Sequence, residues 1–342
     1  TMYANKDDAV TREHMVRLGY LNPLQGAHMP RIGWDPKYVR SDGNNAHSIY
    51  CDDRGLSKAE ERDRFEFNRK FDAIASGIGA EGAGIIKETG LKVEGFSVGD
   101  KVAYAGAPLG AYSSERNYPI KNLVKIPNGI SNEVAATLMT KGLTAYYLLF
   151  KAYAVSSNET LLFHAAAGGV GQIFCQWAKS LGCKVIGTVG SDDKISIAKK
   201  NGCDFIINYS KDDFAKKVLE FTKGEGVPVV YDGVGKNTFH KSIECLKTRG
   251  MMVSFGNASG PLSDINVPQM LQPKGLYLVR PAMQQYLSTK EELDEASKVM
   301  FEKISSGKVK IKIFKKYKLD QVIEAHKDLE GRKILGPAVI LP

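Results

Sequence analysis

The middle of the chain alternates short apolar runs with amphipathic stretches of helical periodicity. The expected strands cover residues 161–164, 184–189, 204–207, 228–231, 251–255 and 276–279, and the expected helices cover 172–181, 192–200, 212–222 and 238–246. Strands that alternate with helices of this length form a parallel sheet joined by right-handed crossovers. The pattern therefore predicts a doubly wound α/β domain over residues 127–284.

The two flanks of this region follow a different pattern. Residues 96–126 contain short strand and turn signals, and the C-terminus closes with an expected helix at 319–330 and an expected strand at 338–341. This layout predicts a β-rich domain built from residues 1–126 and 285–342, with the α/β domain inserted into it. Residues 1–76 are atypical of such a domain, because aliphatic residues are sparse and charges frequent, and the pattern defines no strand there.

Composition places the chain among soluble globular proteins. The 342 residues are 43% hydrophobic, and no stretch approaches the roughly 20 apolar residues that span a bilayer. The first residues lack the apolar core of a signal peptide, so a cytoplasmic protein without membrane contact is expected. The net charge of +9 suits anionic partners such as dinucleotides or RNA, although a solvated basic surface explains it equally simply.

The cysteines offer no framework for disulfides or metal. They are scattered and odd in number, and none forms a C-x-x-C pair: Cys51, Cys175, Cys183, Cys203 and Cys245. This spacing argues against a disulfide scaffold and against a structural zinc site. Buried small apolar residues are the better interpretation.

A glycine-rich turn joins the first expected strand of the α/β domain to its helix. The turn reads Ala165-Ala166-Ala167-Gly168-Gly169-Val170-Gly171. Such a turn lets the backbone approach a pyrophosphate, whose charge then lies at the helix N-terminus. Ala166 stands where the usual fingerprint has its first glycine. Because a strand precedes the turn and a helix follows, the pattern favours a dinucleotide-binding Rossmann domain over a purely structural turn.

The end of the second strand bears on the choice between NAD and NADP. An acid there would bind the ribose 2′-hydroxyl, but the strand ends in Gly190 and Ser191. Lys194 and Tyr209 follow, and a hydroxyl, an ammonium group and a phenol together can hold a 2′-phosphate. A helix cap at Ser191 and a solvated Lys194 are the alternatives. Asp192 and Asp193 leave the choice open, because either could repel a phosphate or accept a hydroxyl.

Several motifs together resemble the medium-chain dehydrogenase/reductase superfamily and, within it, the zinc-independent quinone oxidoreductases of the zeta-crystallin group. Besides the glycine turn and the Gly190–Lys194 segment, they occupy residues 79–84, 98–102, 141–145, 253–260 and 332–333. The resemblance covers about residues 77–342. It implies a GroES-like β domain with an inserted Rossmann domain, NADPH as cofactor and a homodimer.

The resemblance also implies which residues meet the cofactor. Ala167, Gly168, Gly169, Val170 and Gly171 would face the pyrophosphate, and Gly190, Ser191, Lys194, Tyr209 and Arg332 the 2′-phosphate. The nicotinamide and its ribose would lie near Thr144, Phe255, Gly256, Asn257, Ala258, Val279 and Arg280. Asn45 and Tyr50 have the spacing of an Asn and a Tyr that border the nicotinamide in the family, whereas a second family Tyr has no counterpart near residues 56–57.

One departure from the wider superfamily concerns metal. Zinc-dependent relatives carry a histidine where this chain has Ala80, and they carry a group of closely spaced cysteines that this sequence lacks. A catalytic zinc needs about three protein ligands, and the histidines here show no ligand spacing. The chemistry is therefore expected to use no metal.

The function that this resemblance implies is hydride transfer from NADPH to a quinone. Positioning would supply most of the catalysis, and a quinone can take its proton from water, so no catalytic residue is assigned. Tyr50 is a candidate only for orienting a carbonyl. One alternative is an enone or alkenal reductase on the same fold, and another is an NADPH-binding structural or RNA-binding protein, although no RNA-binding motif is present in the sequence.

The first prediction is that the protein needs no zinc. Activity should survive dialysis against a chelator, because Ala80 leaves the superfamily's histidine ligand missing. Elemental analysis alongside the assay checks this. One tightly held zinc per chain, with activity lost on its removal, would contradict the prediction.

Overall fold

The computed structural model describes residues 15–21, 78–263, 265–331 and 333–342, with only the backbone at 15–21. The chain divides into two compact units. The first contains the residues up to Lys125 together with Lys318–Ile323 and Ile340–Pro342. The second contains Ile126–Tyr317 and Glu324–Val339.

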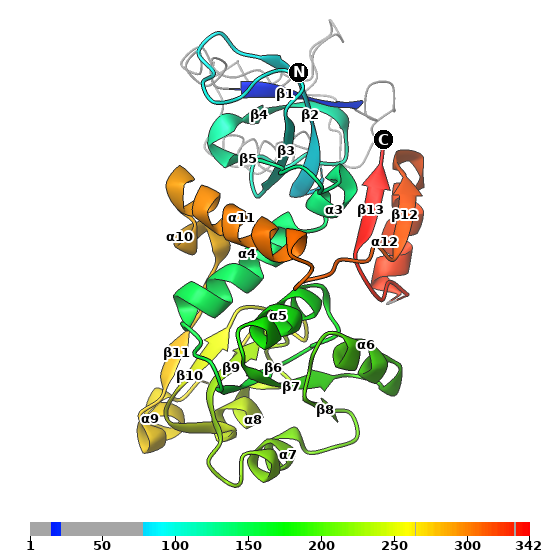
Figure 1. Ribbon diagram of the computed structural model, residues 1–342. Helices are drawn as coiled ribbons and strands as arrows, with labels where there is room; N and C mark the ends of the chain where they lie inside the picture. Colours follow the sequence, from blue (N-terminus) through cyan, green and yellow to red (C-terminus); the bar gives the residue numbers. More distant parts are fainter. Residues whose placement is uncertain (1–14, 22–77, 264, 332) are drawn as a thin grey trace, which may run out of the picture. The chain divides into compact units, whose positions relative to one another are not determined.

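A six-stranded parallel sheet forms the centre of the second unit (Figure 1). Its order is β11-β10-β9-β6-β7-β8, with β6 (Thr160–Phe163), β7 (Lys184–Val189), β8 (Phe205–Asn208), β9 (Val227–Asp232), β10 (Leu246–Ser254) and β11 (Tyr277–Val279). The chain enters at β6, moves outward to β8, returns past β6 to β9 and moves outward again to β11. This is the doubly wound Rossmann order, whose direction reverses between β6 and β9. The α/β prediction is confirmed.

Helices follow the strands where the periodicity predicts them. They are α5 (Gly169–Ser180), α6 (Ile195–Lys200), α7 (Phe214–Phe221) and α8 (Phe239–Glu244). All six residues of β9 are buried, as are five of the six in β7. Strands buried on both faces read as continuous apolar runs, which is why these segments show no alternation in the sequence.

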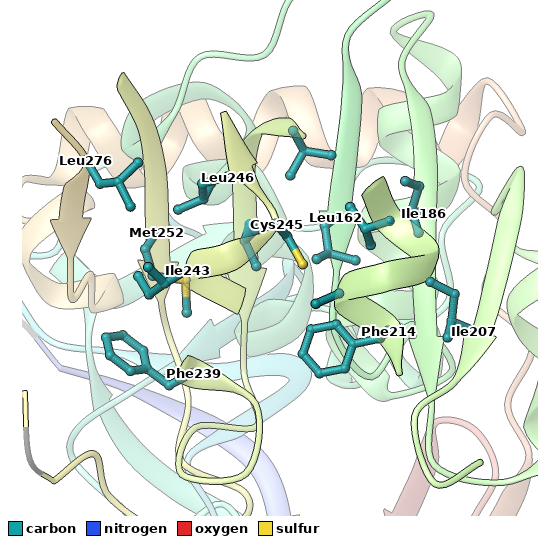
Figure 2. Close-up of a cluster of buried hydrophobic side chains, with 14 residues drawn as sticks. Leu162, Ile186, Ile207, Phe214, Phe239, Ile243, Cys245, Leu246, Met252 and Leu276 are labelled. Atoms are coloured by element: carbon teal, nitrogen blue, oxygen red, sulfur yellow. The ribbon is translucent and has the colours of Figure 1, made fainter. Parts of the chain in front are cut away.

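One apolar cluster lies between the sheet and its helices. Leu162, Ile186 and Ile207, from three adjacent strands, belong to it with Phe214 of α7 and Phe239 of α8. Figure 2 shows these side chains from separate elements sharing one interior. Their burial of apolar surface is the main stabilising contribution to this half of the unit.

A buried polar network connects the carboxyl ends of three strands. The ring of His164, fully buried after β6, bridges the hydroxyls of Thr188 at 2.9 Å and Ser242 at 2.8 Å. Burial lowers the pKa of His164, so the ring is neutral. Asp232, at the end of β9, accepts the Thr238 hydroxyl at 2.8 Å. The network satisfies polar groups that would be costly to bury alone, and it joins the strand ends where a ligand would bind.

The first unit contains a five-stranded sheet of order β4-β1-β2-β3-β5, whose pairs are antiparallel. The strands are β1 (Met15–Leu21), β2 (Glu81–Thr89), β3 (Lys101–Ala105), β4 (Ser114–Pro119) and β5 (Leu123–Lys125). β1 falls in the segment where the sequence pattern defines no strand. It pairs with β2 on one side and β4 on the other, so long-range partners rather than local propensity account for it.

Several helices of the second unit lie outside the elements predicted from the sequence, and the two longest are α4 (Met139–Tyr147) and α11 (Lys290–Ser305). A capping box formed by Thr289 and Glu292 starts α11, which packs against α4 and buries Met300 and Phe301. This unit thus extends past residue 284, where the sequence places the end of the α/β domain. The domain boundary itself stays a prediction.

A short pair of strands lies near the C-terminus. β12 (Lys315–Lys318) pairs with β13 (Ala338–Leu341), and α12 (Val322–Glu330) lies between them in sequence. Among the described residues, no helix combines the length and the apolar character needed to cross a membrane.

Candidate cofactor site

The turn between β6 and α5 is held by backbone hydrogen bonds, one to β7 and one within the turn. The amide of Ala166 donates to the Thr188 carbonyl at 2.9 Å, and that of Gly168 donates to the Ala165 carbonyl at 2.8 Å. Ala165 adopts a φ of 56°, which closes the turn tightly. Helix α5 then begins at Gly169. The first amides of a helix have no partner within the helix, and the helix dipole favours an anion beside them.

The two glycines at the start of α5 differ in what surrounds them. A Cβ on Gly171 would lie 2.6 Å from the carbonyl oxygen of Ala165 and 2.7 Å from that of Ala166. The helix can therefore approach the turn this closely only with glycine there. The three atoms nearest to a Cβ on Gly169 would all belong to the Lys141 side chain, with Cδ at 3.0 Å. Gly169 is therefore covered by a flexible side chain that can move, and it stays the predicted position of the pyrophosphate.

Lys141, to which the sequence analysis assigns no role, also lies at this turn. It belongs to α4, and its Cδ and Cε lie against Gly169 at the first turn of α5. A cation and a helix N-terminus both attract anions. The motif at residues 141–145 contains Lys141, although the resemblance assigns only Thr144 of this motif to the cofactor. Thr144 lies one turn further along α4 and is 8% exposed.

The ends of β7 and β8 lie together, as the 2′-phosphate assignment requires. The hydroxyl oxygen of Tyr209 lies 2.8 Å from where a Cβ on Gly190 would stand. The amide of Tyr209 also donates to the Val189 carbonyl at 3.1 Å. Ser191 precedes a 3-10 turn of residues 192–194, and its carbonyl accepts the Lys194 amide at 3.2 Å. Four of the five assigned residues thus follow two adjacent strand ends.

Asp192 is one of the two acids whose effect on cofactor choice the sequence does not decide. Each of its carboxylate oxygens has a partner. Oδ1 accepts the Asn208 side-chain amide at 2.7 Å, and Oδ2 forms an ion pair with the Lys211 ammonium. These two hydrogen bonds, the one from Lys211 being the larger influence, lower the pKa of Asp192. The carboxylate is therefore ionised and already paired near neutral pH.

Apart from Thr144 on α4, the residues assigned to the nicotinamide side lie at the ends of β10 and β11. The amides of Phe255 and Ala258 donate to the carbonyls of Asp232 at 2.9 Å and Gly233 at 3.2 Å. A Cβ on Gly256 would lie 2.5 Å from the Gly233 oxygen, so the two loops touch backbone to backbone. Asn257 is exposed on the same loop.

Arg280 acts on this loop through its guanidinium. The group donates to the carbonyls of Ser254 at 2.8 Å and Gly256 at 3.0 Å, and it follows Val279, the last residue of β11. The structure therefore shows a side chain that fixes the loop after β10. Direct contact between Arg280 and a cofactor stays a prediction.

The structure describes most of the residues assigned to the cofactor, but not all of them. Those from Thr144 to Arg280 all belong to the second unit, and most follow carboxyl ends of its parallel strands. Ligands of doubly wound sheets bind at that edge. Asn45, Tyr50 and Arg332 lie outside the described residues. Within the described ranges, no three His, Cys, Asp or Glu side chains come together as a metal site.

These features define a dinucleotide-binding α/β unit of the dehydrogenase type. The family model described as "Zinc-binding dehydrogenase" matches residues 169–302. A quinone oxidoreductase of Pseudomonas aeruginosa is 45% identical over 269 residues, which cover 79% of this chain and 83% of the relative. A 2-haloacrylate reductase of a Burkholderia species is 43% identical over 268 residues, 78% of this chain and 80% of the relative.

Solved structures give the same relationship. The crystal structure of Escherichia coli quinone oxidoreductase complexed with NADPH matches with a TM-score of 0.78 at 38% identity, covering 100% of this chain and 95% of that one. The crystal structure of 2-haloacrylate reductase matches with a TM-score of 0.74 at 43% identity, over 78% and 83% of the two chains. The chain belongs to the quinone oxidoreductase family of the medium-chain dehydrogenases/reductases.

The geometry of the turn predicts different outcomes for its two glycines. Gly169→Asp should leave the fold intact, because only a flexible lysine must move, but should abolish dinucleotide binding by placing a carboxylate at the predicted position of the pyrophosphate. Gly171→Ala should instead destabilise the protein by about 2 kcal/mol or more, since its Cβ overlaps backbone oxygens.

Thermal unfolding and fluorescence titration with NADPH measure the two effects. A folded Gly169→Asp protein with unchanged NADPH affinity would remove the glycine turn from the site.

Proposed function

We propose that the chain is an NADPH-dependent quinone oxidoreductase that reduces its acceptor without zinc. The observation that supports this is a combination of two features. A glycine-rich turn precedes α5, and the acid after β7, Asp192, already pairs with Asn208 and Lys211. The quinone oxidoreductases among its relatives, one of them solved with NADPH, support the same cofactor and acceptor.

The roles of the residues follow from their positions. Bound NADPH supplies the hydride. The amides at the start of α5 hold the pyrophosphate, and Lys141 adds a positive charge on the same side. Thr144 and the loop of residues 255–258 border the nicotinamide, and Arg280 keeps that loop in place. Their combined task is to present one face of the ring to the acceptor and to limit water there.

No residue needs to act as a dedicated acid. A quinone that accepts a hydride becomes a stabilised anion, which water can protonate. The chain's work is therefore orientation, with Tyr50 as the proposed partner of a carbonyl oxygen.

A conjugated alkene is the second candidate acceptor. One relative at 43% identity is named a 2-haloacrylate reductase, and a haloacrylate carries a carbon–carbon double bond conjugated to a carboxylate. Reduction of such a bond would use the same cofactor residues. It differs in needing a proton at carbon, for which no donor is assigned.

We also propose a homodimer. β11 is an edge strand of the six-stranded sheet, so one side of its backbone has no partner strand within the described chain. Tyr277 on this strand is 58% exposed, and Val267 of α9 (Val267–Leu271) is 55% exposed. A second copy could pair with this edge and cover both side chains. Sedimentation velocity measures the oligomeric state directly.

Steady-state kinetics tests the reaction. With NADPH fixed, 1,4-benzoquinone and 1,2-naphthoquinone should be reduced with a kcat/KM at least about tenfold above those of simple enones and of 2-chloroacrylate, since only quinones need no assigned proton donor. Faster reduction of 2-chloroacrylate would replace the quinone with a conjugated alkene as the acceptor. No turnover with any acceptor, despite tight NADPH binding, would favour a non-catalytic role.

Cofactor choice is tested at Lys194. Lys194→Glu replaces an attractive charge by a repulsive one beside the group that NADH lacks, so NADPH affinity should fall by at least about tenfold while NADH affinity changes little. Dissociation constants for both dinucleotides at fixed salt decide this. An equal change for both would mean that Lys194 is only a solvated helix residue.

A further inference from the structure

The loop after β7 contains two acids beside the proposed 2′-phosphate position. Asp192 and Asp193 stand between Ser191 and Lys194, so this segment alone carries two negative charges and one positive charge. A 2′-phosphate adds about two negative charges of its own. By charge alone the segment would repel NADPH, and an acid near this strand end is the usual partner of the NADH ribose.

The structure shows that one of these acids is part of the scaffold. Asn208, at the end of β8 and 5% exposed, donates its side-chain amide to Asp192 Oδ1 at 2.7 Å. The Asn208 side-chain oxygen accepts the Ser210 amide at 3.0 Å, which fixes the orientation of the group. The Ser210 hydroxyl donates to the Gly190 carbonyl at 2.8 Å. Asp192 therefore helps to join the loops after β7 and β8.

Lys211 occupies the other oxygen of the same carboxylate. Its ammonium pairs with Asp192 Oδ2, and the two side chains are 65% and 56% exposed. An ion pair this exposed contributes little to folding stability. Its local effect on charge is larger, because Lys211 places a positive charge directly beside the Asp192 carboxylate, while Asp212, its neighbour in the chain, adds a negative one.

We propose that Lys211 determines cofactor specificity by holding and neutralising Asp192, so that a 2′-phosphate is accepted and the ribose hydroxyls of NADH gain no carboxylate partner. The contacts from Asn208 and Lys211 hold the Asp192 carboxylate in one direction, and turning it toward a ribose hydroxyl would break both of them. Lys211 is a positioning residue in this account, and the phosphate is held by Ser191, Lys194 and Tyr209. The inference rests on the proposed use of NADPH.

A double-mutant cycle tests this on the full chain. Dissociation constants for NADPH and NADH are measured at low salt for the wild type, Lys211→Met, Asp192→Asn and the double variant. Lys211→Met should weaken NADPH about five- to tenfold and leave NADH unchanged or tighter, because Asp192 is released. The double variant should bind NADPH within about twofold of Asp192→Asn, because Lys211 then has no charge to neutralise.

Asp193→Asn is the matched control, since it makes the same charge change one residue away. In its background Lys211→Met should still weaken NADPH about five- to tenfold. Raising the salt concentration should shrink the effect of Lys211→Met, as expected for exposed charges. Unchanged thermal unfolding of the variants would confirm that folding is not involved.

Two results separate this inference from the proposed function. If the wild type prefers NADH, the proposed cofactor is wrong. If the wild type prefers NADPH but Lys211→Met weakens both dinucleotides equally, or weakens NADPH as strongly without Asp192 as with it, only the role of Lys211 is overturned. The last case would mean that Lys211 contacts the phosphate itself.

Discussion

The approach of helix α5 to the turn before it is the constraint on which the cofactor site depends. Gly171 lies so close to the carbonyl oxygens of Ala165 and Ala166 that no side chain fits between them. This contact places the first amides of α5 at the carboxyl end of β6. Without it the helix would move outward, and the amides would no longer converge on one anion.

The buried polar network carries this constraint to the neighbouring strands. His164, directly before the turn, joins β7 through Thr188 and α8 through Ser242. Asp232 binds the turn after β9 through the amides of Val234 and Gly235, at 2.7 and 3.0 Å. The loops at the nicotinamide side then follow from the backbone contact between Gly233 and Gly256. The loops that carry the assigned cofactor residues are thus fixed by hydrogen bonds and backbone contacts within the protein.

Electrostatics adds a second level of control at the ends of β7 and β8. Residue type and position in the chain do not show whether Asp192 accepts the ribose hydroxyl of NADH or lies beside the 2′-phosphate of NADPH. The contacts of Asp192 with Asn208 and Lys211 fix the direction of its carboxylate and place a positive charge directly beside it. Residues that lie nineteen positions apart in the chain, such as Asp192 and Lys211, therefore act as one unit in setting the local charge.

The sequence by itself determined the doubly wound sheet and the position of the glycine turn, because strands buried on both faces and amphipathic helices have local signatures. It did not determine β1, whose hydrogen-bond partners are distant in the chain, nor the packing of α11 against α4. It also did not show that Lys141 lies against Gly169 or that Asn208 and Lys211 pair with Asp192. Only the tertiary structure decided these, since a side chain's partner depends on which strand ends and helices the fold brings together, and that information is not local in sequence.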